Sequence, residues 1–215
     1  KSFKKGAIAS FSELIEEKLI EEKLIIGVSN TLKALEKLAK FSRKRNKKLI
    51  KICITGSSGK TTLKDWVSKT FKEHKRIYHT EGNLNNQIGL PLTLANMPRN
   101  SELCVLELGM NSPGEIKKLS EIARPNIAVI TNIGVAHSAN FFNDSGIASE
   151  KSDIFNYLDK NSIAIFPRET KYFNLIKQKA LKKTKKIFVF GNDEICNIKV
   201  ENKMDFEWHF NISGE

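Results

Sequence analysis

The segment from Thr55 to Thr62 constrains the fold of this chain more than any other part of it. It reads Thr-Gly-Ser-Ser-Gly-Lys-Thr-Thr and follows the apolar run Leu49–Ile54. A helix-like segment, Leu63–Phe71, comes directly after it. A strand, a glycine-rich loop and a helix in this order are the setting of a phosphate-binding loop. The alternative is a glycine-rich turn that binds nothing.

Each residue type in this loop suits the binding of a phosphate. The two glycines let the backbone approach an anion closely, and the loop amides and the helix N-terminus point at it. Lys60 can reach the terminal phosphates, and the Thr61 hydroxyl can bind Mg²⁺. The loop is the short form G-x-x-G-K-T, because Ile54 stands where the longer form has its first glycine. The expected phosphate-binding residues are Thr55, Gly56, Ser57, Ser58, Gly59, Lys60, Thr61 and Thr62.

Length and composition indicate a globular protein. At 215 residues and 40% hydrophobic, the chain can form one domain, or one domain and a piece of another. It has no apolar run of the ~20 residues that a membrane span needs, and no signal peptide is visible. Three unpaired cysteines indicate reduced thiols in a cytoplasmic protein, and we assign them no chemistry.

The net charge of +12 raises the question of nucleic-acid binding. Only six of the 36 basic residues are arginines, and the lysines are spread along the chain. Base reading relies mainly on arginine, and stacking needs clustered aromatic side chains. We therefore expect solvated lysine faces that attract anionic substrates, and no nucleic-acid partner.

From Leu49 onward the chain alternates strands and helices, which predicts an α/β fold with a mostly parallel sheet and helices on both faces. Ligands of such sheets bind beyond the carboxyl ends of the strands. The predicted strands are Leu49–Ile54, Leu103–Leu108, Ile127–Thr131, Ser162–Phe166 and Ile187–Phe190. The predicted helices are Lys60–Glu73, Leu90–Asn96, Pro113–Ala123, Ile147–Leu158 and Thr170–Lys182. Before this region we expect a helix over Phe11–Leu24, a strand over Leu24–Val28, a helix over Thr31–Phe41 and a linker over Ser42–Lys48. After it we expect a hairpin of Ile195–Val200 and Phe206–Ile212.

Four positions that follow these elements are candidates for chemistry. Glu107 ends a buried strand and is a candidate Mg²⁺ ligand, or else a structural carboxylate. His137 follows the strand Ile127–Thr131, although a lone histidine is often structural. The segment Asn83–Pro91 is an amide-rich loop or an ordinary asparagine turn. Lys151, judged from its neighbours alone, is a surface lysine.

Four motifs in order resemble those of the Mur ligases, and their details resemble the MurF type. They are Ile54–Thr62, Gly82–Leu94 (GNLNNQIGLPLTL), Glu107–Ile116 (ELGMNSPGEI) and Ile130–His137 (ITNIGVAH). The resemblance covers nearly all of the chain. It implies an ATP-dependent ligase of peptidoglycan precursor synthesis, which adds D-alanyl-D-alanine to UDP-N-acetylmuramoyl-tripeptide. Through an acyl-phosphate intermediate, such a ligase forms an amide, ADP and phosphate.

The resemblance also implies roles for single residues. The residues Gly56 to Thr62 would hold the ATP phosphates, and Thr61 and Glu107 would bind one Mg²⁺. His137 and a carbamylated Lys151 would serve a second Mg²⁺. A bare ammonium repels Mg²⁺, whereas a carbamate supplies oxygen and negative charge. Asn86 would help to place the metal or the γ-phosphate.

By the same resemblance, residues 1–29 would be the end of an N-terminal UDP-substrate-binding domain and residues 30–48 a connecting helix and linker. Residues 49–215 would be most of an ATP-binding central domain, and the chain would lack the C-terminal domain. We expect a monomer. The alternatives are another ligase of the superfamily, such as a folylpolyglutamate-type enzyme, a truncated non-catalytic ATP-binding module, and a P-loop kinase or GTPase.

Overall fold

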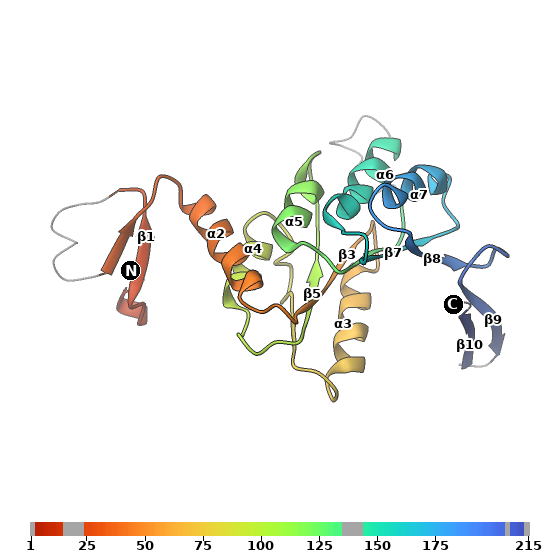
Figure 1. Cartoon of the computed structure of the whole chain (residues 1–215), viewed down its shortest axis with the longest axis horizontal. Coiled ribbons are helices and arrows are strands. Elements are labelled where there is room, and N and C mark those ends of the chain that lie inside the picture. The colour runs from red at the N-terminus through yellow and green to blue at the C-terminus, as the bar shows by residue number, and fades with distance from the viewer. Residues whose placement is uncertain (1–2, 15–23, 135–143, 205–206, 213–215) are drawn as a thin grey trace.

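The computed structural model describes residues 3–14, 24–134, 144–204 and 207–212 (Figure 1). Within these ranges the chain forms one eight-stranded sheet and a separate two-stranded sheet near its N-terminal end. The small sheet pairs β1 (Ala9–Ser12) with β2 (Leu24–Gly27) in parallel. It lies apart from the large sheet, at the far end of helix α2 (Figure 1).

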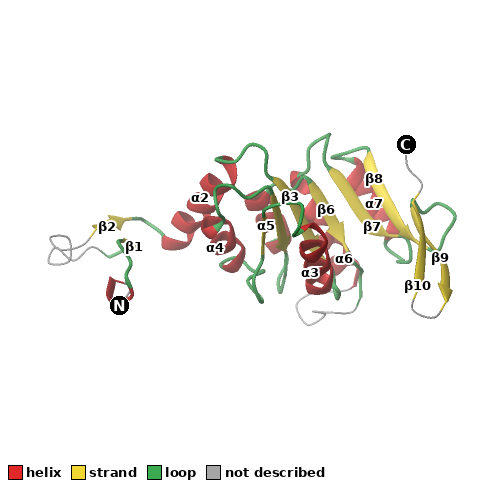
Figure 2. Cartoon of the chain, turned by 90° about the horizontal axis from the view of Figure 1, so that it is seen from below, coloured by secondary structure: helices red, strands yellow, loops and turns green. Residues whose placement is uncertain are grey.

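The large sheet has the strand order β10-β9-β8-β7-β6-β3-β5-β4. All neighbouring pairs are parallel except β9 with β10, which are antiparallel. Figure 2 shows β3, β6, β7 and β8 in succession, with β9 and β10 at one end. The parallel α/β prediction is confirmed, and so is the C-terminal hairpin, although its first strand covers Ile198–Met204 and not Ile195–Val200. The strands are β3 (Ile50–Thr55), β4 (Ile77–His79), β5 (Leu103–Glu107), β6 (Ile127–Ile130), β7 (Ile163–Pro167), β8 (Lys186–Gly191), β9 (Ile198–Met204) and β10 (Glu207–Ile212).

Helices cover the two faces of this sheet unequally. The larger core packs α2, α4, α5, α6 and α7 against one face, through residues such as Leu94, Leu119 and Ile176. The smaller core packs α3 against the other face, through Leu63 and Val67. The α-helices are α2 (Thr31–Lys44), α3 (Lys60–Phe71), α4 (Gly89–Asn96), α5 (Glu115–Ala123), α6 (Asp144–Ser152) and α7 (Phe173–Leu181), and two 3₁₀ turns are η1 (Phe3–Lys5) and η3 (Asp153–Tyr157).

Two local predictions need correction, and one strand was not predicted. The helix expected over Phe11–Leu24 is wrong at its start, where Phe11 belongs to β1, and at Leu24, which opens β2; most of that range lies outside the described residues. The linker expected from Ser42 is helical at first, because α2 continues to Lys44. Strand β4 was not predicted, since its three residues follow a run of charged side chains.

No helix in the described ranges is long and apolar enough to cross a bilayer.

Candidate functional site

The glycine-rich loop lies between β3 and α3, at the carboxyl edge of the parallel strands. Gly56 approaches the chain after β6 so closely that a Cβ there would collide with the Thr131 side chain and lie 3.2 Å from the Asn132 amide nitrogen. Gly59 has a φ of 77° and directly precedes the first residue of α3. Both positions therefore require glycine, and the predicted strand–loop–helix arrangement is confirmed.

Asn132 holds the first half of this loop. Its Oδ1 accepts hydrogen bonds from the amides of Ser57 and Ser58, at 3.0 and 2.9 Å. Its Nδ2 donates to Ser58 Oγ at 2.6 Å. The amides that open α3 have no partner inside the helix, so the anion-facing amides are those from Gly59 onward. Asn132 is not among the predicted site residues, although it lies in the motif that ends at His137.

Two lysine ammonium groups converge on one carbonyl of the loop. Lys60 Nζ donates to Gly56 O at 2.9 Å, and Lys151 Nζ donates to the same oxygen at 3.0 Å. Lys151 is only 2% exposed, so the expectation of a surface lysine is wrong. Burial, and to a smaller extent the neighbouring charge of Lys60, lower the pKa of Lys151 to about 8, against a raising effect of Glu150. Two cations at the loop that precedes the open amides of α3 favour the binding of a polyanion there.

Glu107 ends β5 beside the loop and is 3% exposed. Its Oε2 accepts from the Thr61 hydroxyl at 2.8 Å, and its Oε1 accepts from Asn85 Nδ2 at 2.8 Å. A buried carboxylate next to a hydroxyl is the hard-oxygen donor set that Mg²⁺ prefers, with waters and phosphate oxygens completing the octahedron. The residues present therefore fit one Mg²⁺ ion. No cluster of three His, Cys, Asp or Glu side chains occurs among the residues that the structure describes.

The amide-rich loop places two neighbouring asparagines, Asn85 and Asn86, beside the phosphate loop. Asn86 Oδ1 accepts from the amides of Ile88 and Gly89, at 3.1 and 2.9 Å, and so caps the start of α4. Asn85, its neighbour, makes the contact with Glu107. Both asparagines line a cavity of about 250 Å³ that Lys60 also borders. This cavity has space for a ligand group beside the loop.

The remaining predicted residues have mixed placements. Thr55 is fully buried, and its hydroxyl donates to Leu108 O at 2.9 Å, so this hydroxyl faces the sheet. Thr62 is exposed on the first turn of α3. His137 lies outside the described residues. Cys53 and Cys104 are buried free thiols whose pKa is raised by burial, which agrees with assigning them no chemistry.

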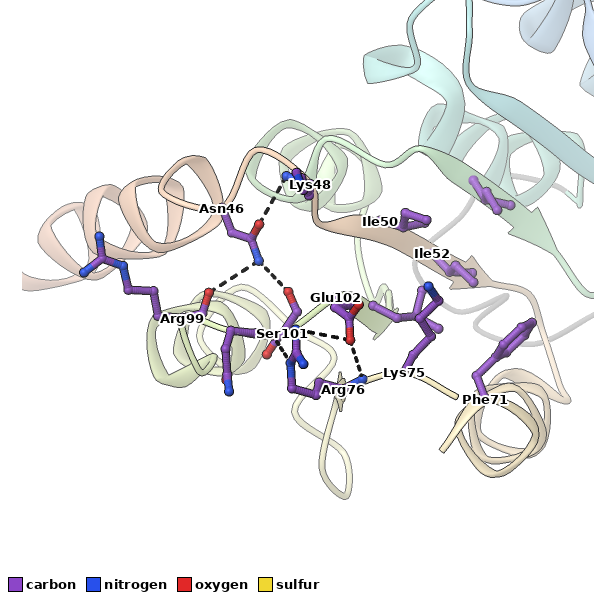
Figure 3. Close-up of a pocket in the computed structure, with 13 residues that line it drawn as sticks. Asn46, Lys48, Ile50, Ile52, Phe71, Lys75, Arg76, Arg99, Ser101 and Glu102 are labelled. Carbon is purple, nitrogen blue, oxygen red and sulfur yellow. Dashed lines mark hydrogen bonds and ion pairs between the residues drawn. The ribbon is translucent and has the colours of Figure 1, made fainter. Parts of the chain in front are cut away.

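A larger cavity of about 590 Å³ lies at the opposite edge of the sheet, where β3 and β5 begin (Figure 3). Basic side chains, including Lys48, Lys75 and Arg99, surround an apolar floor. Its one carboxylate, Glu102, pairs with Arg76 at 3.3 Å. Parallel α/β sheets bind ligands at the carboxyl ends of their strands, so the smaller cavity beside the loop is the candidate site.

Comparison with known proteins places these observations in a family context. The Mur ligase middle domain model matches residues 54–212. The UDP-N-acetylmuramoyl-tripeptide–D-alanyl-D-alanine ligase of Treponema pallidum is 44% identical over 142 residues, which cover 66% of this chain and 31% of that protein. The ligase of the same name from Buchnera aphidicola subsp. Baizongia pistaciae is 39% identical over 200 residues, which cover 92% of this chain and 42% of that protein.

A solved structure is also similar. The MurF ligase of Thermotoga maritima in complex with ADP superimposes with a TM-score of 0.84 and 27% sequence identity. The match covers 98% of this chain and 48% of that one. The chain thus spans less than half the length of each of these relatives.

Proposed function

Since the chain belongs to the Mur ligase family, we propose that it provides the ATP-binding part of a ligase of peptidoglycan precursor synthesis. The proposed reaction joins D-alanyl-D-alanine to UDP-N-acetylmuramoyl-tripeptide at the expense of ATP. The names of the relatives support these substrates. The ADP in the Thermotoga maritima structure supports an adenine nucleotide as the ligand.

One observation carries the proposal: two lysines and a buried carboxylate meet at the phosphate loop. The ammonium groups of Lys60 and Lys151 both lie within 3.0 Å of Gly56 O. Glu107 lies beside them, joined to Thr61. Cations and helix amides stabilise a bound polyphosphate. A carboxylate holds the metal ion near the phosphoryl group that is transferred.

In this proposal each residue of the site acts by binding or orienting. The helix amides from Gly59 onward and the Lys60 ammonium hold the β- and γ-phosphates and offset the charge that spreads over the transferring group. A carboxylate oxygen of the tripeptide attacks the γ-phosphorus, the bond to the β-phosphate oxygen breaks, and ADP leaves. The amine of D-alanyl-D-alanine then attacks the acyl carbon, loses a proton, and phosphate departs.

We assign the Mg²⁺ ion of this reaction to Thr61 and Glu107. When bound, the ion would supply positive charge that stabilises the negative charge of the phosphate groups. The Thr61 hydroxyl and both Glu107 oxygens are already positioned by hydrogen bonds at 2.8 Å, so the donors need little rearrangement. A second ion at Lys151 and His137 stays a proposal. It requires carbamylation of Lys151, because an ammonium has no free lone pair for a metal.

We also propose the division of the chain stated from its sequence. The family match at residues 54–212 supports a central domain over 49–215. The separate small sheet, within residues 1–29, supports assignment of that part to another domain, with α2 as the connecting helix over 30–48.

Binding of ATP by this chain tests the nucleotide site. We expect Lys60→Ala to weaken ATP binding at least tenfold, because the terminal phosphates lose their ammonium partner. Lys69→Ala, at an exposed position of the same helix, is the control and should bind as the unmodified chain does. Equal ATP affinity in the unmodified chain and in Lys60→Ala, measured by calorimetry, contradicts the phosphate-loop assignment.

Phosphate release tests the reaction. Mg²⁺ and ATP are supplied with UDP-N-acetylmuramoyl-tripeptide and D-alanyl-D-alanine, and each substrate is omitted in turn. Release that requires both substrates supports the ligase. ATP binding without such release would identify a nucleotide-binding module that does not turn over alone.

A further inference from the structure

Lys64 is a buried charge that the proposed reaction does not use. It lies on α3, one turn after Thr61, and is 3% exposed. Its ammonium donates to Thr80 O at 3.0 Å and lies 3.2 Å from a carboxylate oxygen of the partly exposed Asp65. Burying an ammonium is costly compared with an apolar side chain of the same size. Packing of the core alone therefore does not explain why a lysine that donates to Thr80 is buried at this position.

Thr80 connects this ammonium to the metal carboxylate. It is fully buried between β4 and the amide-rich loop, and its amide donates to Val105 O at 3.0 Å. Its hydroxyl oxygen accepts the Glu107 amide hydrogen bond, also at 3.0 Å. The backbone of Glu107 is thereby fixed by Thr80, whose own carbonyl is fixed by Lys64.

These contacts close a ring between one helix and one strand. Residues three apart on a helix share a face, so Thr61 and Lys64 point the same way from α3. Thr61 contacts the carboxylate of Glu107 directly, and Lys64 contacts its backbone through Thr80. The ring sets the distance between the hydroxyl and the carboxylate that we assign to Mg²⁺.

We propose that Lys64 is a positioning residue for the Mg²⁺ site, and that it acts on Glu107 through Thr80. The inference rests on the proposed function, because it concerns the metal of that reaction. Partners that orient metal ligands typically change metal affinity by about 10–100-fold when they are removed. Lys64 should thus affect nucleotide binding only where Mg²⁺ contributes to it.

The test separates Mg²⁺-dependent from Mg²⁺-independent ATP binding. ATP affinity is measured across a Mg²⁺ titration and in EDTA, for the unmodified chain, Lys64→Met and Lys69→Met. We expect Lys64→Met to raise the Mg²⁺ concentration at half-effect by roughly tenfold or more, with affinity in EDTA changed less than about twofold. Lys69→Met, at an exposed position, should match the unmodified chain in both conditions.

A second pair of variants serves if Lys64→Met does not fold. Thr80→Val removes the hydroxyl that accepts from Glu107, and Thr80→Ser keeps it. Thr80→Val should raise the Mg²⁺ concentration at half-effect as Lys64→Met does, and Thr80→Ser should leave it unchanged. A purely structural role would lower thermal stability without moving the Mg²⁺ midpoint.

The outcomes distinguish this inference from the function on which it rests. An unmodified chain that shows no Mg²⁺-dependent ATP binding contradicts both. Mg²⁺-dependent binding that is identical in Lys64→Met, or in Thr80→Val and Thr80→Ser, overturns the positioning role and leaves the nucleotide site intact.

Discussion

Lys151 has an environment that changes the chemistry of its amine. Its ammonium is buried against Gly56 O, near the charge of Lys60, and its pKa falls to about 8. An ordinary lysine is almost wholly protonated at neutral pH, whereas about a tenth of this amine is neutral at pH 7. Only the neutral amine has the lone pair that attacks CO₂, so the fold prepares this residue for the proposed carbamylation.

We predict that carbamylation of Lys151 increases with pH. At a fixed pressure of ¹³CO₂, the neutral amine rises from about a tenth at pH 7 to about nine tenths at pH 9, as a pKa near 8 requires. The carbamate is observed as a carbonyl signal in ¹³C NMR spectra. Lys151→Arg should lack this signal, and an identical signal in that variant would show that the carbamate forms elsewhere.

At this scale the sequence singled out several residues that the structure brings together at the loop, but neither Asn85 nor Asn132. Lys60, Thr61 and Glu107 could be predicted, because the first two come directly after Gly59 of the loop and Glu107 ends a buried strand at the same edge. Of two adjacent asparagines, Asn85 rather than Asn86 contacts Glu107. Both asparagines line the cavity beside the loop, and no periodicity in the sequence indicates which of them contacts Glu107.

At the level of elements, amides at the start of α5 donate to a carboxylate that belongs to another helix. Glu150 in α6 is 6% exposed and accepts from the amides of Gly114 and Ile116, at 2.7 and 2.8 Å. A helix N-terminus attracts negative charge and needs acceptors for its first amides. Glu150 therefore joins α5 to the helix that carries Lys151.

We predict that Glu150→Ala lowers the free energy of unfolding by about 1–3 kcal/mol, because the buried amide of Ile116 and the partly buried amide of Gly114 lose a charged acceptor. Glu150→Gln keeps one acceptor oxygen and should lose less. Urea unfolding followed by circular dichroism measures both. Equal stability of the alanine variant and the unmodified chain would contradict the capping role.

The larger elements could be predicted from the sequence because their apolar runs are continuous and their order alternates. Strand β4 could not, since Ile77–His79 is too short for a pattern. The burial of Lys151 also has no local signal. It results from the packing of α6 beside a loop 95 positions earlier in the chain.

The whole molecule carries a net charge of +12, and its proposed ligand is an anion. The positive electrostatic potential of the protein speeds its association with a negatively charged nucleotide. Dissolved salt screens this potential. We predict that the association rate constant for ATP falls roughly tenfold between low salt and ~0.5 M salt, while dissociation changes little. Stopped-flow measurements with a fluorescent ATP analogue test this, and a rate independent of salt would exclude steering.

The strand order has a consequence for the time course of folding. β3 lies between β5 and β6, both of which come later in the chain. The phosphate loop is further held by Asn132, which is 75 positions after Ser57. The chain loses the entropy of closing such long loops before the strands make stabilising contacts. Parallel sheets of this kind therefore form slowly. During synthesis the glycine-rich loop therefore emerges early but acquires its shape only after Asn132 has left the ribosome.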